Sequence, residues 1–199
     1  MNQNTIDNKY EMIKKHHTET LMEAIDTKKV DEILIPFLLE VTKIPDVFTS
    51  SSCAGRIMLL STDEYENKKV SSFHKKYHRK TTFEELKQDT DDFNESELWF
   101  KMEPFIFHFG CKDYEKAKEL LSFSQEFGLK KAGIITAHDG KYILEVTSTQ
   151  YMALPLKENG KMLVTDDYLK FIVDRANKKI EKNFERLEKF SKLFLERFS

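Results

Sequence analysis

Cysteine is scarce in this chain, and long apolar runs are missing altogether. Its 199 residues include only two cysteines, Cys53 and Cys111, too few for a disulfide scaffold and typical of a reducing compartment. No segment approaches the roughly 20 apolar residues that a membrane helix needs, and residues 1–10 lack the apolar core of a targeting signal. We therefore expect a soluble, cytoplasmic protein without a membrane partner.

A strong net charge is also missing, which argues against a general nucleic-acid-binding protein. The formal net charge is −2 at pH 7, whereas such proteins are usually basic. Locally, however, residues 68–80 contain six Lys or Arg, two His and no acid. A solvated edge strand that lysines protect from aggregation is one interpretation. The other is an RNA contact, in which phosphates are bound and unpaired bases stack on rings, with the side chains of Phe73, Lys75, Lys76, Tyr77 and Arg79.

A glycine-rich nucleotide-binding fingerprint does not follow any predicted first strand, so the usual Rossmann-type geometry is not predicted. The length and the 40% hydrophobic content favour one domain with one sizeable core. We predict an α+β fold, in which a mixed, largely antiparallel sheet is flanked by helices. The predicted single domain, 1–199, has a helical part at 1–45, a sheet-containing core at 46–165 and a C-terminal helix at 166–199.

Apolar residues three to four positions apart predict the helices. The longest begins at Asp166 and runs to the C-terminus, and its roughly 33 residues span about 50 Å at 1.5 Å per residue. Because that exceeds the width of a small domain, we expect the helix either to join two copies in a homodimer or to pack across the sheet with a frayed tip. Shorter helices are predicted over residues 10–25, 33–41, 82–92 and 114–127.

Two turn dipeptides, Asp139-Gly140 and Asn159-Gly160, predict tight antiparallel hairpins. Residues 50–56 are predicted to form a loop between two short strands, projecting from a sheet end where α/β proteins commonly hold ligands. The predicted strands lie within residues 47–48, 57–60, 98–109, 132–137, 142–146, 153–156 and 162–164.

This serine-rich segment, Ser50 to Arg56, combines residue types that suit an anion. Serine hydroxyls and successive backbone N–H groups donate hydrogen bonds, Gly55 allows close approach, and the Arg56 guanidinium binds carboxylate or phosphate. Serine-rich turns before an apolar strand are also common connectors. Composition alone therefore leaves both a ligand-binding and a purely structural role open.

Five short motifs in order resemble the tRNA wybutosine-synthesising protein 3 family. The first, TSSSCAGRI at residues 49–57, looks like the family signature, with Ala54 where serine is usual. A second departure is Tyr77, where tryptophan is expected. The other similar blocks are SSFHKKYHR at 71–79, EPFIFHF at 103–109, KAGII at 131–135, and EVTST at 145–149 followed by LPL at 154–156.

The resemblance implies an S-adenosylmethionine-dependent tRNA methyltransferase that is not of the Rossmann type. Its implied substrate is the N4 nitrogen of a wyosine-type (7-aminocarboxypropyl-demethylwyosine) base at guanosine 37 of tRNA-Phe. Transfer of a methyl group from sulfur to nitrogen requires alignment and removal of a proton. The predicted cofactor-binding residues are Ser51, Ser52, Cys53, Gly55 and Arg56.

Three side chains are predicted as proton acceptors or substrate-positioning groups, namely Glu103, His78 and His108. A hydrogen-bonded core histidine is an alternative for His108, and Glu103 can simply end a strand. A thiolate nucleophile at Cys53 is a further alternative. Two histidine pairs, His16-His17 and His74 with His78, could in principle bind a metal. No metal site is predicted, because no cluster of cysteines or carboxylates completes either pair.

Three functional classes therefore remain. One is the methyltransferase, a second is a non-catalytic module that binds tRNA and presents it to another enzyme, and a third is a cysteine-dependent hydrolase that uses Cys53. Stabilisation by the methyl donor distinguishes the first from the other two, because a ligand that binds the native state raises its stability.

Overall fold

The structure is a computed structural model in which two compact units are each built around one antiparallel sheet. It describes residues 3–65, 67–94 and 97–199. The first unit contains the residues up to Ala54, Phe105–Thr149 and Arg186–Ser199, and the second contains Gly55–Pro104 and Gln150–Glu185. The predicted α+β class and the long C-terminal helix are confirmed, and the single mixed sheet is replaced by two sheets. One tRNA-modifying domain over the whole chain stays a prediction.

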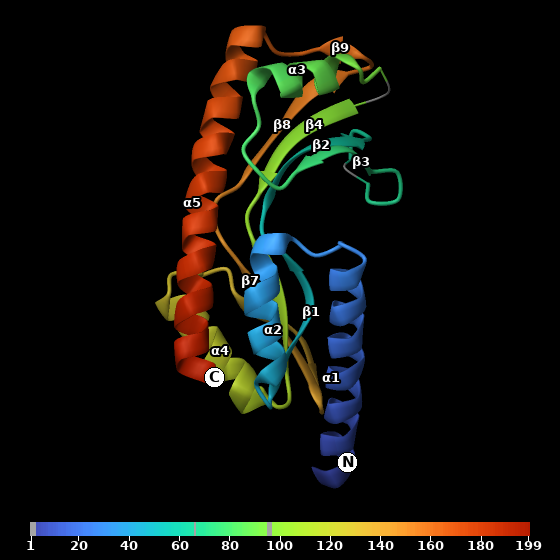
Figure 1. Cartoon of the computed structure of the whole chain (residues 1–199). Coiled ribbons are helices and arrows are strands. Elements are labelled where there is room, and N and C mark those ends of the chain that lie inside the picture. The colour runs from blue at the N-terminus through green and yellow to red at the C-terminus, as the bar shows by residue number, and fades with distance from the viewer. Residues whose placement is uncertain (1–2, 66, 95–96) are drawn as a thin grey trace. The chain divides into compact units, whose positions relative to one another are not determined.

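Helices account for most of the first 45 residues and for the C-terminal part of the chain (Figure 1). Pro36 lies in the first turn of its helix, where a proline costs no hydrogen bond. Thr82 caps the next helix through a reciprocal capping box with Glu85. None of the helices in the described residues is long and apolar enough to cross a membrane. The helices are α1 (Gln3–Asp26), η1 (Glu32–Leu34), α2 (Ile35–Lys43), α3 (Phe83–Asp91), α4 (Tyr114–Glu126) and α5 (Asp166–Phe198).

The sheet of the first unit has the strand order β1-β5-β7-β6. Helix α1 lies along β1 in Figure 1, and Tyr10 and Ile13 of α1 pack on Phe48 and Ile143 of the sheet. The predicted Asp139-Gly140 turn joins β6 to β7, with Gly140 at φ 74°. The strands are β1 (Val47–Cys53), β5 (Ile106–Cys111), β6 (Gly133–His138) and β7 (Lys141–Thr147).

Phenylalanine rings fill the other face of this sheet. Phe107 and Phe109 of β5 are fully buried, and Phe190 of α5 stacks on Phe107 with ring centroids 6.0 Å apart. Phe194 stacks on Phe109 at 4.8 Å, and Phe37 of α2 meets Phe107 edge to face at 5.2 Å. Such aromatic pairs add to the stabilisation from burial, so β5 is anchored firmly from one side.

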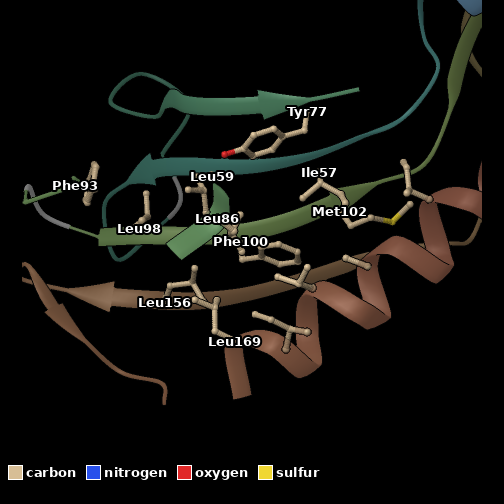
Figure 2. Close-up of a cluster of buried hydrophobic side chains, with 14 residues drawn as sticks. Ile57, Leu59, Tyr77, Leu86, Phe93, Leu98, Phe100, Met102, Leu156 and Leu169 are labelled. Carbon is tan, nitrogen blue, oxygen red and sulfur yellow. The ribbon is translucent and has the colours of Figure 1, made fainter. Parts of the chain in front are cut away.

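The sheet of the second unit has the order β3-β2-β4-β8-β9. Its core lies between the sheet, α3 and the part of α5 up to Glu185, and Figure 2 shows Leu59, Phe100 and Leu169 within it. The predicted Asn159-Gly160 turn joins β8 to β9, with both residues at positive φ. The strands are β2 (Arg56–Thr62), β3 (Ser72–Tyr77), β4 (Glu97–Glu103), β8 (Met152–Glu158) and β9 (Lys161–Met162).

Candidate functional site

The serine-rich segment is a strand, which corrects the predicted loop. Ser50, Ser51 and Ser52 belong to β1 and pair with β5, with an irregular register between Thr49 and Ser51. Since backbone groups of a paired strand are used in the ladder, the segment does not wrap an anion with successive N–H groups. The chain turns only after Cys53, where Gly55 adopts φ 99°.

Strand pairing places Ser51, His108 and Glu145 in one row across three neighbouring strands. Ser51 of β1 lies opposite His108 of β5, and His108 lies opposite Glu145 of β7. The Ser51 Oγ to His108 Nδ1 distance is 2.7 Å, and the His108 Nε2 to Glu145 Oε2 distance is 2.9 Å. Both ring nitrogens of His108 are therefore hydrogen-bonded.

The carboxylate determines which ring nitrogen donates. An ionised carboxylate only accepts hydrogen bonds, so His108 Nε2 donates to Glu145, and in the neutral ring Nδ1 is left to accept from the Ser51 hydroxyl. The His108 and Glu145 side chains are 26% and 35% exposed, and Ser51 is exposed. The row is thus accessible to a ligand, and it contains a group that can accept a proton. His108 is hydrogen-bonded, as the core-histidine alternative expects, but its side chain is partly exposed.

Two further contacts fix β1 beside this row. Gly110 of β5 lies under the Phe48 ring, and a Cβ atom at Gly110 would stand 2.0 Å from Phe48 Cζ. At the end of β1, the Ala54 backbone N–H donates to Asp31 Oδ2 at 2.7 Å. Asp31 lies just before η1, so its carboxylate ties that connection to the serine strand.

In the second unit, Arg56 and Glu103 form an ion pair across β2 and β4. Arg56 Nε and Nη2 donate to Glu103 Oε2 at 3.1 and 2.9 Å, and the two residues are directly opposite in the register. The Arg56 guanidinium also lies 4.7 Å from the centroid of the Phe73 ring, as does Lys76 Nζ. Arg56 is therefore held in place by a carboxylate and a ring.

The five side chains predicted to contact RNA divide into two groups. Phe73 is 46% exposed on the edge strand β3, and Lys76 lies over it. Lys75 pairs with Asp89 at 3.0 Å, and Arg79 binds Glu85 with both terminal nitrogens, at 3.1 and 2.7 Å. Acids from the following helix thus offset part of the positive charge of this edge.

Tyr77 is not available for stacking on a base, which corrects that prediction. Its side chain is only 9% exposed because its ring belongs to the hydrophobic core of the second unit, where Figure 2 shows it near Leu59. Its hydroxyl donates to Asp89, and burial raises the pKa of Tyr77. The hydroxyl therefore remains protonated at neutral pH.

The remaining predicted residues lie in both units. His78 is exposed just after β3 in the second unit, whereas Cys53 is half-buried at the end of β1 in the first. The structure thus brings His108 together with Ser51, and Glu103 together with Arg56.

Glu145 and Asp31 were missed as site residues by sequence reasoning. Glu145 stands in one of the family-like blocks, and the Asp139-Gly140 turn predicts which strands pair around it. Its place opposite His108, however, depends on the pairing of β5 with β7, which are separated by a helix and a strand. No local pattern marks Asp31.

Comparison with protein families and known proteins gives consistent matches over nearly the whole chain. The family model described as Methyltransferase TYW3 matches residues 7–196. A protein of Pyrococcus abyssi is 32% identical over 181 residues, 91% of this chain and 93% of its own length. It is named tRNA(Phe) 7-((3-amino-3-carboxypropyl)-4-demethylwyosine(37)-N(4))-methyltransferase 1. A Methanocaldococcus jannaschii protein with the corresponding name is 32% identical over 179 residues, covering 89% of this chain and 93% of its own.

Solved structures show the same similarity. The PH1069 protein from Pyrococcus horikoshii aligns with a TM-score of 0.88 at 30% identity, covering 94% of this chain and 96% of its own. A hypothetical protein from Aeropyrum pernix aligns with a TM-score of 0.71 at 27% identity, covering 83% of this chain and 98% of its own.

Proposed function

The chain belongs to the methyltransferase TYW3 family, and on this premise we propose that it methylates the N4 nitrogen of 7-(3-amino-3-carboxypropyl)-4-demethylwyosine at position 37 of tRNA(Phe). The observation that carries the proposal is that relatives 32% identical over about nine-tenths of both chains are named for this reaction. We infer that S-adenosylmethionine is the methyl donor.

The reaction needs a group that accepts a proton. A nitrogen–carbon bond forms, a sulfur–carbon bond breaks, and the proton on the acceptor nitrogen leaves. When bound, S-adenosylmethionine supplies an electrophilic methyl carbon on a cationic sulfur, so the protein chiefly aligns the nitrogen and removes the proton.

We propose that His108 accepts this proton through the Ser51 hydroxyl. Ser51 donates to His108 Nδ1 at 2.7 Å, so it can pass its proton on while taking the one from the acceptor nitrogen. The imidazolium that forms is stabilised by Glu145, 2.9 Å from Nε2. Of the other predicted acceptors, Glu103 is ion-paired with Arg56, which supports His108.

For the methyl donor, the proposed binding residues are Ser51, Ser52, Cys53, Gly55 and Arg56. Two of the five N–H donors of Arg56 are directed at one Glu103 oxygen. The guanidinium therefore keeps donors for an anionic group while its orientation is fixed. For RNA, Phe73 and Lys76 offer an exposed ring and a cation on β3, whereas Lys75 and Arg79 reach phosphate only in competition with Asp89 and Glu85.

tRNA(Phe) is the proposed partner, and a homodimer through α5 and a cytoplasmic location are part of the same proposal. The test is methyl transfer from labelled S-adenosylmethionine to tRNA(Phe) from a strain lacking this protein, compared with fully modified tRNA(Phe). We expect label in the unmodified tRNA alone, at N4 of the wyosine-type base on nucleoside analysis. Tight tRNA binding without incorporation would contradict the proposal and favour the non-catalytic module.

A further inference from the structure

A small cavity lies between α1 and the serine-rich strand of the first unit. Its volume is about 190 Å³, below the roughly 300–1,000 Å³ typical of pockets for whole drug-sized ligands. It therefore suits one short arm of a larger ligand. The polar lining comes from His17, Thr20 and Lys29 on one side and from residues 49–52, a threonine and three serines, on the other.

The α1 wall of the cavity is a single helix face. His17, Thr20 and Ala24 follow one another at intervals of three and four residues, so their side chains share a face. The His17 ring stacks on Phe48 with centroids 4.8 Å apart, and burial lowers the pKa of His17, which favours the neutral ring. Lys28 then takes φ 54°, and the Lys29 N–H donates to the Ala24 carbonyl at 2.8 Å. This turn brings Lys29 to the cavity.

The polar atoms of the lining differ in what they offer. The Thr20 hydroxyl already donates to the His16 carbonyl at 2.9 Å, and the Ser51 hydroxyl is engaged with His108. Their oxygens are therefore left to accept hydrogen bonds from a ligand. Lys29 is a cation that forms no ion pair with any residue in the described part of the chain. The lining combines a positive charge with hydroxyl acceptors.

We propose that this cavity binds a 3-amino-3-carboxypropyl group, with Lys29 bound to its carboxylate and the hydroxyl oxygens of Thr20 and Ser51 accepting from its ammonium. The inference rests on the proposed function, because two molecules of that reaction carry this group. One is S-adenosylmethionine, in which it is attached to the sulfonium sulfur, and the other is the base to be methylated. The Ser51 hydroxyl would then contact both this arm and His108.

The experiment has one arm for each source. In the first, titration calorimetry compares S-adenosylhomocysteine with 5′-methylthioadenosine, which lacks the amino-acid arm. In the second, kcat/KM is compared for tRNA(Phe) carrying the base with and without its aminocarboxypropyl arm. Both arms compare the full wild-type chain with Lys29→Ala. The matched control is Lys28→Ala, which removes the same charge from a neighbouring residue outside the cavity lining.

We expect Lys29→Ala to reduce the preference for the arm-bearing molecule about tenfold or more in one of the two comparisons, because a charge-assisted hydrogen bond is lost. The comparison that changes identifies the source. Lys28→Ala should change neither preference. Lys29→Arg, which keeps the positive charge, should retain most of the preference that Lys29→Ala reduces.

The proposal is overturned if Lys29→Ala leaves both preferences at the wild-type ratio, or if Lys28→Ala lowers them equally. Absence of methyl transfer by the wild type would instead contradict the proposed function. The calorimetric comparison needs no tRNA, so it would still test the cavity in that case. Equal affinity for S-adenosylhomocysteine and 5′-methylthioadenosine would then count against the proposed binding of the arm.

Discussion

His108 Nε2 lies 2.9 Å from Glu145 Oε2, and the two residues face each other across neighbouring antiparallel strands. The other ring nitrogen, Nδ1, is hydrogen-bonded to the Ser51 hydroxyl. In our proposal, Glu145 therefore does not contact the base nitrogen that is methylated. It acts on the reaction by fixing the ring orientation and the position of the ring proton, and by stabilising the imidazolium.

Glu145→Gln should therefore lower kcat by about tenfold to a hundredfold while leaving KM for tRNA nearly unchanged. An amide keeps the shape of the side chain but can no longer stabilise a positive ring. Single-turnover kinetics and steady-state KM measure the two effects. Glu145→Asp should recover part of kcat, and Glu119→Gln, which removes a carboxylate from α4 of the same unit, should have wild-type rates. A rise in KM at constant kcat would contradict the assignment.

Lys76→Ala should weaken tRNA binding and reduce the slope of log K against log salt by about 1, because one phosphate contact is lost. Tyr77→Phe should leave tRNA binding unchanged. It should lower the free energy of unfolding by about 1 kcal/mol, because its hydroxyl bonds to Asp89. Filter binding between low and moderate salt, with chemical denaturation alongside, checks both variants. Wild-type tRNA affinity in Lys76→Ala would argue against the edge strand as the RNA contact, and a loss of affinity in Tyr77→Phe would contradict the inward position of that ring.

Gly110→Ala should lower the free energy of unfolding by about 1 to 3 kcal/mol, because the added Cβ would stand 2.0 Å from the Phe48 ring. Gly133→Ala is the matched control in the same sheet, since a Cβ there meets no atom within 4 Å. Its effect should stay within about 0.5 kcal/mol. Urea denaturation measures both, and similar midpoints for the two variants would contradict the close packing of Phe48 on β5.

The capping box of α3 should make stability depend on pH. Arg79 and the Thr82 backbone N–H hold the pKa of Glu85 at about 2 in the folded chain, below its usual value of 4.5. Because the pKa of Glu85 is lower in the folded than in the unfolded chain, its ionised carboxylate stabilises the fold at pH values above the unfolded pKa. This stabilisation is lost as the pH falls through the folded pKa. The Tm advantage of wild type over Glu85→Gln should thus be full at pH 7 and shrink between about pH 4.5 and pH 2.

Thermal unfolding monitored by circular dichroism at pH 7 and pH 3 tests this. Glu84→Gln is the control, because Glu84 lies in the same turn and forms no ion pair with the residues that the structure describes. A Tm difference between wild type and Glu85→Gln that does not change with pH would contradict the role of the ion pair.

Local elements and the family could be predicted from the sequence, because they depend on neighbours in the chain. Apolar spacing predicted the helices, and Asp139-Gly140 and Asn159-Gly160 predicted two hairpins. The five motifs between residues 49 and 156 identified the family without any spatial information.

The arrangement of the site was decided by tertiary structure, because it depends on contacts between residues distant in sequence. The serine-rich segment forms a strand because β5 pairs with it, and 58 positions separate Ser50 from the His108 carbonyl that it contacts. Glu145 lies beside His108 only because β5 also pairs with β7. Tyr77 was predicted to face RNA because a basic edge strand looks exposed in sequence. Strand alternation and packing in the hydrophobic core of the second unit instead place its ring inside. The free energy of burial favours this position, and it depends on distant residues that local composition does not reveal.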